Sequence, residues 1–539
     1  MSFPIPMQVH LIWHPADDAL CRPMAEQIRL ALTRDAYQPL VPGIGMPVFY
    51  RCAGAIPGDR NGVPRPISIP DTRNDLRIAF VTAELLDDPG WQGYLDRNLA
   101  EVKTKSPSAA MVRIALSPAA AGGADLAIAL DRTDPRTPGQ VLQLVLLQAC
   151  RLLGGRPRQG AQQRGAAAMK LFLSHTKRDT VGLTIATALK SFLDGLRVDR
   201  FFDEVSIQPG DSLADELKAE IQDAALVAIR TDGYVSSPWC RQELALAKTA
   251  RRPMVVVDAL TDQEPRSSPL LTNLPSVRLA VGDLDRQKRL DEVVNFIGLE
   301  ALRFLHGELQ LRLLQEKKWI EPGAKLLTRP PEARDLAAIQ SHSNGRPVFV
   351  HPDPVLTAEE AADLEAFQAS FLTPTSLWGQ RLDGKRIGLS IGDPDAAELL
   401  ALGLSKAHID DAARILARQV VAAGGTVVYG GTLSDKSLTE CLFEMIGAYN
   451  RGGNQARRLW SGPARSAVAA GRRQRAKRRR KPDAVQHRQP RRGSASDHEG
   501  SGGGVWPHLA DIARASCSAR RGVTTGQAGV RFDRPANPR

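Results

Sequence analysis

The sequence has few residues in the arrangements that build metal centres or disulfide frameworks. Its six cysteines lie far apart, with no CxxC pair and no cluster of cysteine and histidine. This spacing argues against a zinc site and against disulfides, and it suits a reducing compartment. No set of serine, histidine and aspartate points to nucleophilic catalysis either. We therefore expect a cytoplasmic protein that carries no metal and no bound cofactor.

Long apolar runs are also absent. The most apolar run, VLQLVLLQAC at Val141–Cys150, is far shorter than the ~20 residues that span a bilayer. The first residues, MSFPIPMQVHLIW, lack the basic and then apolar regions of a signal peptide. We expect no membrane partner. At 539 residues, with 43% hydrophobic and 24% charged residues, the chain should hold about three globular domains.

The net charge of +12 comes from the end of the chain. Residues 451–539 hold 21 Lys and Arg against 5 Asp and Glu, so the first 450 residues carry a net charge of −4. The run RRQRAKRRRKPD is typical of a nuclear-localisation or nucleic-acid patch. Yet this segment lacks periodicity and changes composition abruptly, as an off-frame reading of a GC-rich gene would. We interpret it as a disordered or off-frame tail rather than a nucleic-acid arm.

The remaining chain alternates apolar strands with amphipathic helices, which predicts α/β domains with parallel, doubly wound sheets. Ligand-binding loops then lie at the carboxyl ends of the strands. The predicted divisions are an α/β domain at 1–153, a linker at 154–168, a second α/β domain at 169–302, a helical and loop connector at 303–345, a Rossmann-like domain at 346–450, and the tail at 451–539.

Three motifs in the second α/β domain occur in a characteristic order. LFLSH is followed by RD, then by the loop SIQPGD, and then by SSPWCRQEL. Together they resemble a bacterial TIR (Toll/interleukin-1 receptor) domain over about Met169–Leu302. The resemblance implies a flavodoxin-like parallel sheet and self-association through TIR domains. It also implies that Ser206–Asp211 is the BB loop, which gates the pocket, and that Glu243 is the residue that cleaves NAD⁺ in catalytic members.

The chemistry can also be argued from the residue types. Loss of neutral nicotinamide from a ribose carbon develops oxocarbenium character, as in glycoside hydrolysis. A carboxylate held against the ribose can stabilise that charge, so one acid, an aromatic wall and a movable loop are enough. NAD⁺ would be the substrate and not a cofactor. The expected pocket residues, besides the catalytic Glu243, are Ser174, His175, Trp239, Ser206 and Asp211.

Each of these residues also has an ordinary structural interpretation. A glutamate in the first turn of a helix is favoured by the helix dipole alone, by about 0.3–1 kcal/mol. His175 follows a strand and can simply cap a loop, and Asp211 can cap the next helix. We expect Cys240 to be a buried packing thiol, because no histidine follows it locally.

The first domain repeats part of the second. VHLIWHPADD mirrors KLFLSHTKRD, and AFVTAELLDDPGW has the same length as VAIRTDGYVSSPW, with a tryptophan at the end of both. Four residues beyond Trp239 comes Glu243, whereas four beyond Trp91 comes Leu95. We interpret the first domain as a degenerate TIR-like copy that lacks the catalytic acid. The alternative is that any doubly wound domain shows this periodicity.

The Rossmann-like region resembles a SLOG domain, from the family related to LOG and DprA proteins. The motifs are RIGLSIGDPD and GGTVVYGGTLSDKSLTECLFEMI. Glycine at strand ends lets backbone amides approach a phosphate, and a following helix offers its N-terminus. The candidate nucleotide-binding residues are Ser390, Gly392, Gly430 and Gly431. On the off-frame interpretation of the tail, this domain is truncated.

Together these patterns predict a TIR NAD⁺ glycohydrolase of bacterial defence or signalling. We expect it to be activated by assembly and regulated by a nucleotide-derived ligand at the SLOG-like domain. The alternative is a scaffold without enzymatic activity that signals through TIR–TIR contacts. A nucleic-acid-binding regulator acting through the tail is a third hypothesis.

Overall fold

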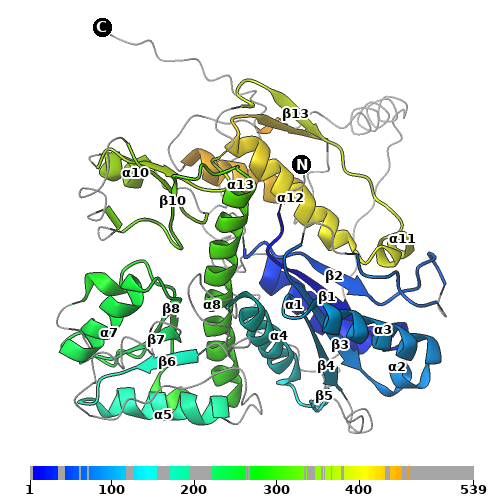
Figure 1. The fold of residues 1–539 in the computed structure, drawn as a ribbon, viewed down its shortest axis with the longest axis horizontal. Helices are drawn as coiled ribbons and strands as arrows, with labels where there is room; N and C mark the ends of the chain where they lie inside the picture. The colour runs from blue at the N-terminus through cyan, green and yellow to red at the C-terminus, as the bar shows by residue number, and fades with distance from the viewer. Residues whose placement is uncertain are drawn as a thin grey trace, which may run out of the picture. The chain divides into compact units, whose positions relative to one another are not determined.

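The computed structural model describes residues 4–33, 43–59, 62–68, 72–116, 127–154, 170–194, 221, 224–262, 264, 267–332, 335–336, 346–353, 356, 358–365, 367–377, 381–430, 438–451 and 459–460. All of them lie within the unit Met1–Ala469. They form four sheets in which every strand pairing is parallel, with helices between the strands (Figure 1). The predicted α/β fold class is confirmed.

The first sheet has the order β2-β1-β3-β4-β5. This is the flavodoxin-like order, in which the chain reverses direction at the first strand. Its central strands are buried on both faces, as expected when helices cover a parallel sheet on both sides. The strands are β1 Gln8–Ile12, β2 Val48–Arg51, β3 Asp75–Val81, β4 Ala109–Ala115 and β5 Ala127–Ala129, and the helices are α1 Asp18–Thr33, α2 Ala83–Asp87, α3 Pro89–Lys105 and α4 Thr137–Gly154.

The second sheet has the order β6-β7-β8-β9, which matches β1-β3-β4-β5 of the first. The sequence VDRFFDE at residues 198–204 also predicts a strand, but it lies outside the described residues, so this comparison covers four strands. The elements are β6 Lys170–Ser174, α5 Thr180–Asp194, β7 Ala224–Arg230, α7 Pro238–Thr249, β8 Met254–Asp258, β9 Ser276–Arg278 and α8 Gln287–Glu316. The duplication and an unrelated doubly wound domain both predict this shared order, so the duplication stays a prediction.

Helix α8 joins the two sheets into one packed body. Its 30 residues extend about 45 Å without interruption, passing residue 302, where the sequence predicted a domain limit. It packs on α4, and buried apolar residues of both sheets form one continuous cluster. Arg136 Nε lies 2.7 Å from Asp291 Oδ2, and Asn295 Nδ2 donates to the carbonyl of Gly139 over 3.0 Å. The first domain therefore covers one face of α8.

Two three-stranded sheets follow, with the orders β10-β11-β12 and β13-β14-β15. The first comprises β10 Lys325–Leu326, β11 Val348–Val350 and β12 Ser370–Leu372, with α10 Ala358–Glu365 between its last two strands. The second comprises β13 Arg386–Leu389, β14 Thr426–Tyr429 and β15 Leu459–Trp460, with α11 Ala396–Ala401, α12 Lys406–Ala422 and α13 Leu438–Arg451. The predicted limit at residue 450 falls within α13, and β15 follows it.

The length and apolarity of the described helices decide whether any of them could cross a membrane. None of the helices among them is both long enough and apolar enough to cross a bilayer. The predicted tail from residue 461 onward lies outside the described residues.

Candidate functional site

Helix α7 presents Glu243 from its second turn. The helix begins at Pro238, whose fixed backbone angle and missing N–H suit a first helical position. Ser237 caps it by accepting a hydrogen bond from the Cys240 amide over 3.4 Å. Cys240 and Leu244 are buried against the sheet, which orients the helix. Because the dipole effect fades beyond the first turn, it accounts poorly for an acid at Glu243.

The Glu243 carboxylate lies against the end of β6. Ser174, the last residue of that strand, donates a hydrogen bond from its hydroxyl to Glu243 Oε2 over 2.5 Å. The Ser174 oxygen also lies 2.6 Å from the hydroxyl of Tyr234. Since a serine hydroxyl has a single proton, Tyr234 must be the donor in that second bond whenever Ser174 donates to Glu243. The three side chains therefore form one directed chain that ends on the carboxylate.

The protonation of Glu243 reflects competing effects. Burial raises the pKa of Glu243 to about 7, against the hydrogen bond from Ser174 and the positive charge of Lys177, which both lower it. Burial also raises the pKa of Tyr234 well above its ordinary value, so its hydroxyl stays a donor at neutral pH. A carboxyl group that titrates near neutrality is typical of catalytic sites, although structural networks also shift pKa values.

Tyr234 is a member of this site that the sequence reasoning missed. It is fully buried and lies in the turn between β7 and α7. Strand β6 pairs in parallel with β7, so the carboxyl ends of both strands meet at one edge of the sheet. A polar aromatic side chain just after β7 could therefore have been expected beside Ser174.

The other predicted pocket residues have different outcomes. Trp239 lies one turn before Glu243 on α7 and exposes 51% of its surface, so it is available to a ligand. His175 places Nδ1 3.3 Å from the Leu173 carbonyl, which is a local contact at the strand end. Ser206 and Asp211 lie outside the described residues. Cys240 is buried, and burial raises the pKa of its thiol to about 11, as a packing role requires.

The matching place in the first domain is filled with apolar side chains. Leu95, which corresponds to Glu243, belongs to a buried cluster with Leu85 and Trp91. Trp91 is fully buried, in contrast to its exposed counterpart Trp239. Trp13 takes the position of Ser174 after β1 and donates from Nε1 to Asp18 over 3.0 Å.

The glycine-rich strand ends of the last sheet lie side by side. Strands β13 and β14 pair in parallel, with Leu389 opposite Tyr429. Ser390 and Gly392 therefore follow one strand at the same edge where Gly430 follows the other. A Cβ added at Gly392 or Gly430 would meet no atom of the described residues within 4 Å, so among these residues the backbone at this edge is open to a ligand. Gly431 lies outside the described residues.

Comparison with known families agrees with the two resemblances seen in the sequence. Residues 171–294 match the family model described as TIR domain, and residues 381–476 match the one described as SLOG cluster2. The chain contains a TIR domain and a SLOG domain. Their combination supports a TIR signalling or defence protein. The SLOG match, like β15, extends past residue 450. No curated protein and no solved structure gives a significant match to the chain.

Proposed function

We propose that the TIR domain is an NAD⁺ glycohydrolase with Glu243 as its catalytic residue. The observation that carries this proposal is the partly buried Glu243 carboxylate, bonded by Ser174 at the carboxyl ends of β6 and β7. Ligands of open α/β sheets bind at this edge. Desolvating a carboxylate away from a helix terminus costs stability even when it is only partly buried, and a catalytic role explains an acid at this place.

In the proposed reaction the bond between ribose C1′ and the nicotinamide nitrogen breaks, and its electron pair leaves with neutral nicotinamide. The ionised Glu243 accepts hydrogen bonds from the ribose hydroxyls and stabilises the oxocarbenium character at C1′. A water oxygen then bonds to C1′ and releases a proton to the solvent. Ser174, held by Tyr234, fixes the carboxylate in one orientation, and the exposed face of Trp239 offers a wall for an aromatic ring.

We also propose that a ligand bound to the SLOG domain regulates the TIR domain. We place a nucleotide-derived ligand at the SLOG strand ends, at Ser390, Gly392, Gly430 and Gly431, where its binding promotes self-association of TIR domains. The juxtaposed ends of β13 and β14 and the open space at Gly392 and Gly430 support this placement. We propose a cytoplasmic protein whose partners are further copies of itself.

The test measures nicotinamide release by the purified full chain incubated with NAD⁺, alone and with candidate nucleotides. Glu243→Gln keeps the shape of the side chain and should abolish release. Gln242→Ala, an exposed neighbour on the same helix, is the matched control and should retain it. Undiminished release in a folded Glu243→Gln variant would sink the assignment. Self-association of the wild type with no release under any condition would favour the non-enzymatic scaffold.

A further inference from the structure

A large cavity lies apart from both sites described so far. Its volume is about 1670 Å³, which exceeds the 300–1,000 Å³ of most small-molecule pockets. It is bounded by α8, by the loops that follow β10, β11 and β12, by α12, and by loops of the first two sheets. Neither Glu243 nor the strand-end residues Ser390, Gly392 and Gly430 line it. It can therefore hold a ligand of its own.

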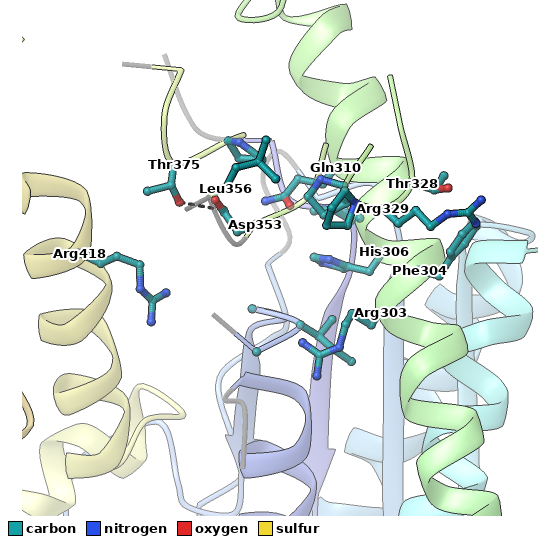
Figure 2. A pocket seen from close by; sticks show the side chains of 18 of the residues that line it. Arg303, Phe304, His306, Gln310, Thr328, Arg329, Asp353, Leu356, Thr375 and Arg418 are labelled. Carbon is teal, nitrogen blue, oxygen red and sulfur yellow. Dashed lines mark hydrogen bonds between the residues drawn. The ribbon is translucent and has the colours of Figure 1, made fainter. Parts of the chain in front are cut away.

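Arginine is the prominent charged residue of the cavity wall. Five separate segments each contribute one arginine, namely Arg252, Arg303, Arg329, Arg381 and Arg418. Figure 2 shows Arg303 and His306 projecting from α8, and Arg418 from α12, toward the same space. Four carboxylates line the cavity too, namely Glu300, Asp353, Glu360 and Asp363, and Glu300 forms an ion pair with Arg303 over 3.3 Å. Planar guanidinium groups match the geometry of phosphate oxygens and hydrogen-bond them in pairs.

Two polar side chains in the wall have buried atoms without partners. Asp353 accepts a hydrogen bond from Thr375 on Oδ2 over 2.8 Å, whereas its buried Oδ1 accepts none from any described residue (Figure 2). His306 is 3% exposed, and its Nε2 is likewise without a hydrogen-bond partner among the described residues. Burial lowers the pKa of His306 to about 4, so the ring is neutral. Buried polar atoms in native proteins normally have partners, so these two atoms point to a missing one.

The pattern of donors, acceptors and apolar surface identifies a class of ligand. Arginines suit phosphate, a carboxylate oxygen suits ribose hydroxyls, and a neutral imidazole can hydrogen-bond a base. Phe304 and Leu356 supply aromatic and apolar wall. A free phosphate would leave Asp353 without a partner and would face it with like charge. A nucleotide satisfies the arginines with its phosphates and Asp353 with its ribose hydroxyls.

We infer that this cavity binds a phosphate-bearing nucleotide, with Arg418 and Arg303 on its phosphates and Asp353 on its ribose. The site is distinct from the SLOG strand ends, and its binding does not depend on whether Glu243 cleaves NAD⁺.

Calorimetric titration of the full-length Glu243→Gln chain, which lacks the proposed catalytic acid, with ATP, ADP-ribose and inorganic phosphate tests the inference. At least one nucleotide should bind saturably with a Kd below about 100 μM, and phosphate should bind far more weakly. Arg418→Ala and Asp353→Asn, each added to that chain, should weaken nucleotide binding at least about tenfold. Arg414→Ala removes the same charge one turn earlier on α12, outside the cavity wall, and should bind as before.

Several results would overturn the inference. One is the absence of nucleotide binding up to about 1 mM. A second is phosphate binding as tightly as the nucleotides, which would mark a simple anion site. A third is binding that survives both cavity variants but is lost in Gly392→Val, which would move the ligand to the SLOG strand ends. If Arg418→Ala and Arg414→Ala weaken nucleotide binding equally, the effect comes from the net positive charge of α12 and not from a contact in the cavity. Thermal unfolding of each variant checks that it is folded. The two cavity variants lie on different elements, so the test remains valid if only one of them folds.

Discussion

Ser174 and Glu243 are 69 residues apart in the sequence, yet the hydroxyl of one donates a hydrogen bond to the carboxylate of the other over 2.5 Å. This contact joins the end of β6 to the second turn of α7. It lowers the pKa of Glu243, whereas burial raises it. The balance between these two effects sets the pH range in which the proposed catalyst is ionised.

Removing the Ser174 hydroxyl should shift this balance. In Ser174→Ala, Glu243 loses the donor that favours its ionised form, so its pKa rises. The ascending limb of the profile of kcat/KM against pH should move to higher pH, with a several-fold loss of activity at pH 7. Thr184→Ala, an exposed hydroxyl on α5, serves as the control. An unchanged pH profile in Ser174→Ala would separate this hydrogen bond from catalysis.

The pH dependence of stability should carry the signature of Glu243. Its folded-state pKa of about 7 lies above the ordinary 4.5, so the folded protein holds this proton more tightly than the unfolded chain. Holding this proton contributes fully to the free energy of unfolding below pH 4.5. The contribution, about 3 kcal/mol in total, is lost as the pH rises through about 7. Glu243→Gln cannot titrate and should lack this loss. Urea unfolding of both proteins at pH 5 and pH 8 measures the difference, and parallel behaviour would contradict the assigned pKa.

The first domain should not regain activity from a single acid. Leu95→Glu places a carboxylate in the apolar cluster around Trp91, where burying an unpaired polar group costs about 2–5 kcal/mol. We expect a lower Tm and no nicotinamide release when this change is made in the Glu243→Gln chain. Gln92→Glu, at an exposed position of the same helix, is the matched control for the added charge. Restored release would show that the first domain retains a usable pocket.

Helix α7 should depend on an ion pair near its other end. Lys248 is buried, and its Nζ donates to both carboxylate oxygens of Glu332, over 2.7 and 2.8 Å. Glu332→Gln leaves a buried ammonium without its counter-charge and should cost about 3–5 kcal/mol in unfolding free energy.

The exposed Glu321→Gln should be nearly neutral and controls for the lost charge. The double variant Lys248→Met with Glu332→Leu removes both charges and should recover most of the stability. If the double variant is no more stable than Glu332→Gln, packing rather than charge explains the effect.

Several features of the fold could be predicted from sequence because they depend on local pattern. Apolar runs such as ALVAIR predicted buried strands, and the segment SSPW predicted the start of α7. The WCRQE motif singled out Glu243, and glycine at strand ends singled out Gly392 and Gly430. The family matches at 171–294 and 381–476 confirm the two resemblances drawn from these motifs.

Other features could not be predicted because they depend on long-range packing. The sequence placed a domain limit at residue 302, but α8 continues through this position as one helix because it packs on α4 and on the sheets. Tyr234 carries no motif of its own, and its place in the site follows from the pairing of β6 with β7. The pair of Lys248 with Glu332 joins residues 84 positions apart, which no local signal predicts.

The sequence by itself determined the order of strands and helices, the TIR and SLOG motifs, and the identity of the acid in SSPWCRQEL. These depend on residue types and short spacings that local backbone physics fixes. Only the tertiary structure decided that Glu243 is partly buried beside Ser174 and Tyr234, with a pKa near 7, while Leu95 lies in an apolar cluster. A pKa and a hydrogen-bond chain depend on burial and on distances across the fold, which form only when the strands pair and the helices pack.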